Sequence, residues 1–393
     1  MCANKKKVWI ICPFNNVAYI FMDIYELFKD EWDPLFVFLF KDTFSERLLA
    51  DAGLRTYTID YWEIMKNNKL KREYLFLREA DKLIRQEGLP EISFNQEMPT
   101  IFSKYIMKRM KDKKKLRLFY AWGYLPDNYD YSKVKFTIKN FMYRLIFKSI
   151  GYPMGAYFPV DSDIILVRSE LFKKLVERHT EPGTDIRTVG YWLKNKLDCL
   201  KSAEVQIEMQ RRFIDKFGMP DRKIISFLTQ PLLDKAQFGR YRELLPRLLD
   251  KLGKYSKDCN IVMKMHPRDK RELYEVIVKE YPYIKLLNWS DFNTFELISA
   301  SDVVLGYCST TLMDAVYMGK SVYSFDIEDN DKKDRYYKEL PLINPDREID
   351  LFGDYEISHE LKAHLSSIIP MVNFRDALSN VIGEGKQHAG KDI

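Results

Sequence analysis

The stretch Asn260-Ile-Val-Met-Lys-Met-His-Pro-Arg-Asp269 decides the fold of this chain, together with a second stretch, Asp302-Val-Val-Leu-Gly-Tyr-Cys-Ser-Thr-Thr-Leu-Met-Asp-Ala-Val-Tyr-Met-Gly-Lys-Ser321. Each predicts a buried β-strand that ends in small polar or basic residues and leads into a helix. Open parallel sheets form anion sites in this way, because ligands bind outside the carboxyl ends of the strands and helix amides point at them. Two such units in one half of the chain predict a clamp for the phosphates of a nucleotide.

Short apolar runs alternate with helical patterns over the rest of the chain. The strands expected in the N-terminal half cover 8–14, 34–40, 55–59, 91–96, 116–121, 163–168 and 186–190. After a polar helical stretch over 202–217, the strands expected in the C-terminal half cover 223–228, 260–265, 284–287, 302–305 and 321–325. Strands that alternate with helices form parallel sheets that are covered on both faces. We therefore expect an α/β fold with two Rossmann-like, doubly wound domains.

The length of 393 residues agrees with two domains, because it exceeds the size at which a single hydrophobic core stops growing. We expect an N-terminal domain over 1–195, a linker over 196–222, a second domain over 223–356, and a C-terminal helix with a flexible tail over 357–393. Within that last segment the pattern favours a helix over 358–381 and disorder from Gly385 onward.

Cysteine usage and the length of the apolar runs limit the classes of protein to consider. The five cysteines are scattered without Cys-X-X-Cys pairing, which favours a reducing cytosol over a disulfide framework or a zinc site. No apolar run approaches the roughly 20 residues of a spanning helix. The apolar stretch over 8–12 is too brief for the core of a signal peptide. We expect a cytoplasmic protein without a metal.

Basic residues cluster locally, although the net charge of +6 from 63 basic and 57 acidic residues is mixed. The segment 133–148 interleaves lysine and arginine with phenylalanine and tyrosine. Such a segment can lie on an anionic membrane surface, or it can be a solvated helix face that covers a core. No nucleic-acid-binding module accompanies the charge, so a nucleic-acid partner is not expected.

Polar residues after the expected strands are the candidate binding residues. His266 precedes Pro267 and Arg268 at an expected helix start, so imidazole, guanidinium and backbone amides converge where an anion would sit. The hydroxyls of Ser309, Thr310 and Thr311 begin the next helix, where they could also be ordinary N-caps. Further expected donor contacts are Thr229, Gln230, Lys264, Gly306, which lets backbone approach a ligand, and Asp314, which could reach a ribose hydroxyl.

The pairing of the strand-Lys-Met-His-Pro-Arg turn with the strand-Gly-Tyr-Cys-Ser-Thr-Thr-helix unit resembles the donor-binding half of GT-B glycosyltransferases. It is most similar to bacterial sialyltransferases, capsule polysaccharide transferases and CDP-glycerol glycerophosphotransferases, which share an HP motif and a Ser/Thr pair. The similarity is firmest from Ile224 to Phe325. It implies two domains that face a cleft, a histidine at His266 that contacts the donor phosphate and assists the leaving group, and phosphate-binding hydroxyls at Ser309 and Thr310.

The catalytic base is where the sequence departs from these families. Their acidic pair followed by glycine has no counterpart after 116–121, where this chain has Trp122-Gly123-Tyr124. A metal-independent transfer needs a carboxylate or histidine near the acceptor hydroxyl. Glu97, directly after the strand expected over 91–96, is the first choice for the base, and Asp127 is the second.

These observations predict a metal-independent glycosyltransferase that moves a sugar from a nucleotide donor to a surface-glycan, polysaccharide or lipid-linked acceptor. The sialyltransferase similarity favours a CMP-linked acidic sugar, and the nucleotide sugar is a substrate, so no separate cofactor is expected. The segment 133–148 would attach the protein to the inner face of the membrane. Two alternatives stay open: a nucleotide-sugar 2-epimerase, which shares the architecture and a Ser/Thr pair before a helix, and a non-catalytic binding module that lacks the base.

Overall fold

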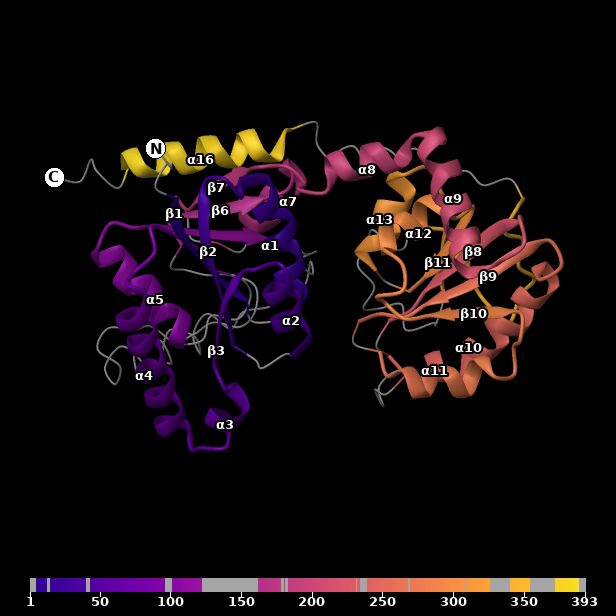
Figure 1. Ribbon diagram of the computed structural model, residues 1–393, viewed down its shortest axis with the longest axis horizontal. Helices are drawn as coiled ribbons and strands as arrows, with labels where there is room; N and C mark the ends of the chain where they lie inside the picture. Colours follow the sequence, from indigo (N-terminus) through magenta and orange to yellow (C-terminus); the bar gives the residue numbers. More distant parts are fainter. Residues whose placement is uncertain are drawn as a thin grey trace. The chain divides into compact units, whose positions relative to one another are not determined.

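The computed structural model describes residues 5–12, 15–39, 43–95, 101–121, 162–177, 180, 183–230, 232–233, 239–267, 269–307, 309–325, 340–353 and 372–388. The chain divides into two compact units (Figure 1). Unit 1 comprises 1–192 and 367–393, and unit 2 comprises 193–366. Among the described residues, no helix has both the length and the apolar character needed to cross a bilayer.

Unit 1 is built on a seven-stranded parallel sheet with the order β3-β2-β1-β4-β5-β6-β7. The strands are β1 Lys6–Cys12, β2 Trp32–Phe38, β3 Arg55–Thr58, β4 Ile92–Asn95, β5 Leu116–Ala121, β6 Ile164–Val167 and β7 Asp185–Thr188. The helices are α1 Asn15–Phe28, α2 Thr43–Asp51, α3 Tyr61–Met65, α4 Lys69–Glu87, α5 Ile101–Asp112, α7 Glu170–Glu177 and α16 Phe374–His388.

Both faces of this sheet are covered, because successive side chains of a strand point to opposite faces. Val8 and Ile10 of β1 contribute to one core with α1 and α16. Trp9 and Ile11 of the same strand contribute to a second core with α4 and α5. Continuous apolar runs such as 8–12 are therefore strands buried on both faces.

Unit 2 is built on a six-stranded parallel sheet with the order β10-β9-β8-β11-β12-β13. The strands are β8 Lys223–Leu228, β9 Cys259–Lys264, β10 Ile284–Leu287, β11 Val303–Gly306, β12 Ser321–Phe325 and β13 Leu342–Ile343. The helices are α8 Lys194–Lys201, α9 Ala203–Phe217, α10 Gly239–Leu252, α11 Arg271–Val278, α12 Thr294–Ala300 and α13 Thr310–Tyr317, with a 3-10 turn at Gly253–Tyr255.

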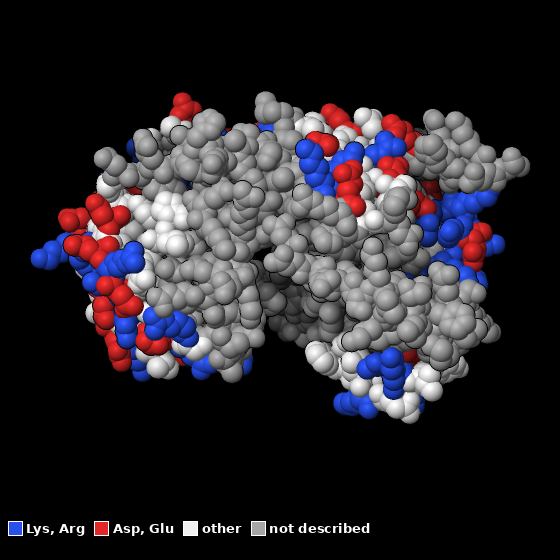
Figure 2. Space-filling view, turned by 180° about the vertical axis from the view of Figure 1, so that it is seen from behind, with Lys and Arg blue, Asp and Glu red and all other residues white. Residues whose placement is uncertain are grey.

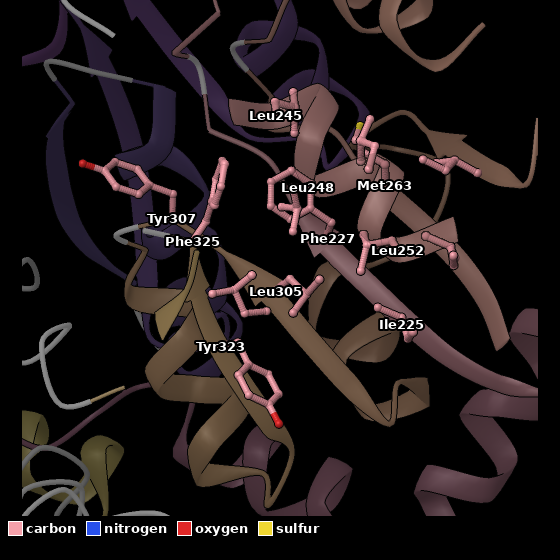
Figure 3. Packing of buried hydrophobic residues seen from close by; sticks show 14 of the residues in the cluster. Ile225, Phe227, Leu245, Leu248, Leu252, Met263, Leu305, Tyr307, Tyr323 and Phe325 are labelled. Carbon is pink, nitrogen blue, oxygen red and sulfur yellow. The ribbon is translucent and has the colours of Figure 1, made fainter. Parts of the chain in front are cut away.

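One face of the unit 2 sheet is covered by α10. Leu245, Leu248 and Leu252 of this helix are three or four residues apart, so they form one apolar stripe that packs on Ile225 and Phe227 of β8 (Figure 3). Each fully buried leucine of this kind contributes roughly 1.5–3 kcal/mol. The opposite face is covered by α9, α12 and α13, among which α9 and α12 contact each other.

The segments outside the two expected domains are also built into the units. The stretch 196–222, expected as a linker, lies within unit 2 and is mostly α8 and α9. The last helix, α16, belongs to unit 1, where Phe374 and Leu378 are buried against its sheet. The side chain of Asn373 accepts from the amides of Arg375 at 3.0 Å and Asp376 at 3.3 Å, which sets the start of α16. This helix continues to His388, past Gly385, where the sequence predicts disorder.

Candidate functional site

The carboxyl ends of β9, β8 and β11 are neighbours in the unit 2 sheet, and His266, Thr229 and Ser309 follow these strands. The chain first runs from β8 through β9 to β10, and then returns to the other side of β8 at β11. Strand order therefore reverses between β8 and β11. In open α/β sheets, ligands bind outside the carboxyl ends of the strands at such a point.

A network of hydrogen bonds fixes the turn at His266. The amide of His266 is shared between Thr229 Oγ1 and Asp269 Oδ2, each at 2.8 Å. The hydroxyl of Thr229 donates to the same carboxylate of Asp269. The amide of Asp269 donates to the carbonyl oxygen of His266 at 2.9 Å, which closes the turn. We call residues 266–269 the His-Pro turn.

Two expectations about this turn are corrected. Pro267 does not begin a helix, because α11 begins at Arg271 and the turn closed by Asp269 comes first. The amide of His266 is occupied by Thr229 and Asp269, so it does not point outward to an anion. His266 as a whole is partly exposed.

Asp269 is a residue of the candidate site that the sequence analysis missed. A carboxylate three residues after the histidine is a signal for a side chain that bonds back to the backbone of a turn. The carboxylate restrains both Thr229 and His266, which belong to neighbouring strand ends. Asp269 therefore positions the His-Pro turn.

A buried tyrosine, Tyr274, supports the neighbouring strand end. Tyr274 donates a hydrogen bond to the carbonyl oxygen of Gln230 at 3.0 Å, which holds the backbone after β8. Burial, together with the negative charge of Asp269, raises the pKa of Tyr274 far above its usual value. The pKa of Tyr241 is raised in the same direction by burial. Both hydroxyls therefore stay protonated.

The N-terminus of α13 forms the other part of the site. Ser309 is the N-cap, and its Oγ accepts from the amide of Thr311 at 3.4 Å. Ser309, Thr310 and Thr311 are all partly exposed. The first amides of a helix have no partner within the helix, and the helix dipole places partial positive charge there. This end of α13 is suited to an anion such as phosphate.

Gly306 is closely packed beneath α13. A Cβ at this position would lie 3.0 Å from Cδ2 of Leu312 and 3.3 Å from the carbonyl oxygen of Leu228. The absence of a side chain therefore brings α13 close to β8 and β11. This packing is a structural reason for glycine at position 306, in addition to the expected approach of a ligand.

Lys264 and Asp314 are buried. Lys264 is 2% exposed, and its ammonium donates to the carbonyl oxygens of Asn288 at 3.4 Å, Trp289 at 2.6 Å and Phe292 at 2.5 Å. Burial lowers the pKa of Lys264 to about 8. Lys264, which the sequence analysis expects to contact the nucleotide sugar, holds the segment between β10 and α12. Asp314 is 4% exposed within α13, and its contact with a ribose stays a prediction.

The remaining candidates lie outside the described residues. They are Glu97, Asp127 and Arg268, together with the segment 133–148. Their roles as base, donor contact and membrane segment stay predictions. Among the residues that the structure describes, no group of three or more histidine, cysteine, aspartate or glutamate side chains is arranged to hold a metal ion.

Comparison with solved structures identifies the fold. No protein-family model and no curated protein sequence matches the chain. A putative UDP-N-acetylglucosamine 2-epimerase from Listeria monocytogenes is similar at 15% identity over 98% of this chain and 97% of its own, with a TM-score of 0.58. The Neisseria meningitidis UDP-GlcNAc 2-epimerase bound to UDP-GlcNAc is similar at 14% identity over 98% of this chain and 100% of its own, with a TM-score of 0.56. A glycosyltransferase from Rickettsia africae is similar at 12% identity over 98% of this chain and 94% of its own, with a TM-score of 0.53.

The chain therefore has the GT-B-like fold of two parallel-sheet, Rossmann-like domains that these structures share. At identities of 12–15%, the similarity establishes the fold and leaves the activity open. The resemblance to sialyltransferases and CDP-glycerol transferases has no support from a matching sequence family.

Proposed function

We propose that this chain is an enzyme that acts on a nucleotide sugar, and that unit 2 holds the nucleotide diphosphate. The observation that carries the proposal is the placement of the His-Pro turn and the N-terminus of α13 on one sheet edge, on either side of β8, where strand order reverses. One part offers a histidine side chain, and the other offers hydroxyls and amides. Both groups favour a phosphate.

The reaction we favour is epimerisation of a UDP-linked N-acetylamino sugar. Two of the similar structures described above carry the name UDP-GlcNAc 2-epimerase, and their similarity extends over nearly the whole chain. This reading replaces the CMP-linked donor that the sequence favours. Glycosyl transfer is the second candidate, because the Rickettsia africae glycosyltransferase has a similar fold and the motif around His266 resembles that of transferases.

In either reaction the residues of unit 2 would do the same work. The imidazole of His266 would stabilise negative charge on the diphosphate when a bond to it breaks, and α13 would add its dipole and hydroxyls. Thr229 and Asp269 would hold His266 in place, because both bond to its amide. Preorganised groups of this kind stabilise developing charge without having to move.

Incubation of the full chain with UDP-GlcNAc in D2O distinguishes these reactions. Inversion at a carbon that carries hydrogen ordinarily removes and returns that hydrogen, so an epimerase gives the 2-epimer with deuterium from the solvent. A glycosyltransferase gives free UDP and a glycosylated acceptor when an acceptor is supplied. Neither product, and no binding of UDP or UDP-GlcNAc by calorimetry, would remove the proposal.

Replacement of Ser309 by aspartate is expected to lower the affinity for UDP at least tenfold, which is about 1.4 kcal/mol. Aspartate is as good an N-cap as serine, so α13 should keep its stability. Its negative charge would lie where we place the phosphates. Calorimetric titration measures the affinity, and thermal unfolding measures the stability.

Ser202→Asp is the matched control, because Ser202 also caps a helix of unit 2 through a hydrogen bond from the amide of Val205, at 3.3 Å. This variant should keep both the affinity and the melting temperature. Equal affinities of the Ser309 and Ser202 variants would show that Ser309 is a cap only.

A further inference from the structure

Unit 1 carries an exposed apolar surface where α3 is followed by α4. Among the described residues, three of the four most exposed large hydrophobic side chains lie here: Trp62 at 64%, Tyr74 at 63% and Leu70 at 62%. We call residues 60–74 the α3–α4 tip. Figure 1 shows it at the end of unit 1 opposite α16. Exposed apolar side chains that gather at one place mark interaction sites more often than isolated ones do.

Hydrogen bonds of two helix caps hold the backbone of the tip. Asp60 accepts from the amide of Glu63 at 3.1 Å and caps α3, and Asn68 accepts from the amide of Lys71 at 3.0 Å and caps α4. Ile64 is buried toward the core of unit 1.

Leu70 and Tyr74 are four residues apart on α4, so they lie on the same face of the helix. On α3, Trp62 contacts the ring of Tyr61, with the centroids 5.4 Å apart, and Tyr61 in turn contacts Phe76 at 5.7 Å. The exposed indole therefore rests on a chain of rings that leads into the core.

The charge of the tip is unusual for the start of a helix. The first turn of α4 holds Lys69 and Lys71 and no acidic residue. The helix dipole places partial positive charge at a helix N-terminus, and the two lysines add their positive charge to it. Two acids of the tip have a cation beside them: Glu63 is paired with Lys66 at 2.5 Å, and the buried Glu73 lies 3.9 Å from Arg72. In Figure 2, the region of α3 and the start of α4, at the lower right, is mainly white and blue.

We propose that the α3–α4 tip docks onto an anionic lipid surface. Tryptophan and tyrosine favour the membrane–water interface, because their rings are apolar at one end and polar at the other. Lysines beside them attract anionic headgroups, and Leu70 would enter the acyl region. The residues of this surface are not those of the segment 133–148, to which the sequence analysis assigned membrane attachment.

Other partners fit the tip less well. A second copy of the chain, related by a twofold axis, would bring the same lysines of both copies together, which opposes association. A single nucleic-acid strand would stack its bases on Trp62 and Tyr74, but Leu70 lies on the same helix face as Tyr74 and offers no ring. An apolar residue among cations and interfacial aromatics matches lipid.

Sedimentation of the full chain with vesicles tests the attachment. The protein should bind phosphatidylglycerol vesicles at low salt and bind phosphatidylcholine vesicles poorly. Each lysine near an anionic surface contributes about fivefold in affinity. The double variant Lys69→Glu/Lys71→Glu should therefore bind at least ~25-fold more weakly.

Lys111→Glu/Lys113→Glu is the matched control, because it makes the same change of charge at exposed positions elsewhere in unit 1. It should bind nearly as well as the unaltered protein. Absence of binding by the unaltered protein, or equal losses in the two double variants, would overturn the proposal.

Insertion is tested separately by Trp62→Phe. The tryptophan fluorescence of the unaltered protein should shift to shorter wavelength when phosphatidylglycerol vesicles are added, because Trp62 leaves water. The Trp62→Phe variant should still sediment with vesicles and should lose most of the shift. An undiminished shift in this variant, or a dimer in solution that Leu70→Ser dissociates, would contradict docking on lipid.

Discussion

Replacement of His266 by alanine is expected to lower turnover of UDP-GlcNAc roughly 100-fold to 1000-fold, the usual effect of removing a group that stabilises charge in the transition state. His266 is partly exposed, and its amide is bonded to Thr229 and Asp269. Alanine keeps that amide and therefore keeps the turn. The melting temperature should change little, and steady-state kinetics with purified protein measures the loss.

Asp269→Asn provides the comparison for this variant. Asparagine has the same shape but a weaker acceptor for the amide of His266 and the hydroxyl of Thr229. The Asn variant should lose both activity and thermal stability, because Asp269 acts through the turn. Near-normal turnover of the His266→Ala variant would remove this histidine from the mechanism.

Replacement of Lys264 by methionine should destabilise the protein by about 3 kcal/mol, because it leaves buried carbonyl groups without a donor. Methionine replaces the stem of the lysine but not its ammonium, so the loss comes from the carbonyl oxygens of Asn288, Trp289 and Phe292. Chemical unfolding measures it. Lys285→Met, at an exposed position of β10, should remain within about 0.5 kcal/mol of the unaltered protein.

The cost of Lys264→Met should also grow with pH. Burial lowers the pKa of Lys264 to about 8, from 10.5. As pH rises from about 8 toward 10.5, the folded protein has lost this proton while the unfolded chain still holds it. Stability from this group therefore rises over that window, by linkage. The methionine variant lacks this gain, so equal losses at pH 7 and pH 10 would contradict a buried amine.

Much of the fold could be predicted from the sequence, because strands buried on both faces leave continuous apolar runs. The stretches around Val262 and Val304 are such runs, and both are strands of the unit 2 sheet. The short helix α3 and the helix α8 were missed, since five to eight residues give little periodicity. α16 packs against strands of unit 1 that lie more than 200 residues earlier in the sequence, so its extent could not be predicted from the local pattern.

The candidate site was predicted less completely. Position after a strand was enough to find His266 and Thr229, which the structure joins by a hydrogen bond. The role of Lys264 could not be predicted from its position, because the carbonyl groups that accept hydrogen bonds from its ammonium come from a segment more than twenty residues later. Asp269 carries a local signal, but its bond to Thr229 requires β8 and β9 to be neighbours.

The central claim is that the carboxyl edge of the unit 2 sheet binds a nucleotide diphosphate. A crystal structure of the full chain with UDP tests it most directly. We predict that the phosphates lie between the imidazole of His266 and the N-terminus of α13, within hydrogen-bond distance of Ser309 or Thr310. Phosphate density elsewhere on the protein, or no bound nucleotide at millimolar UDP, would contradict the account.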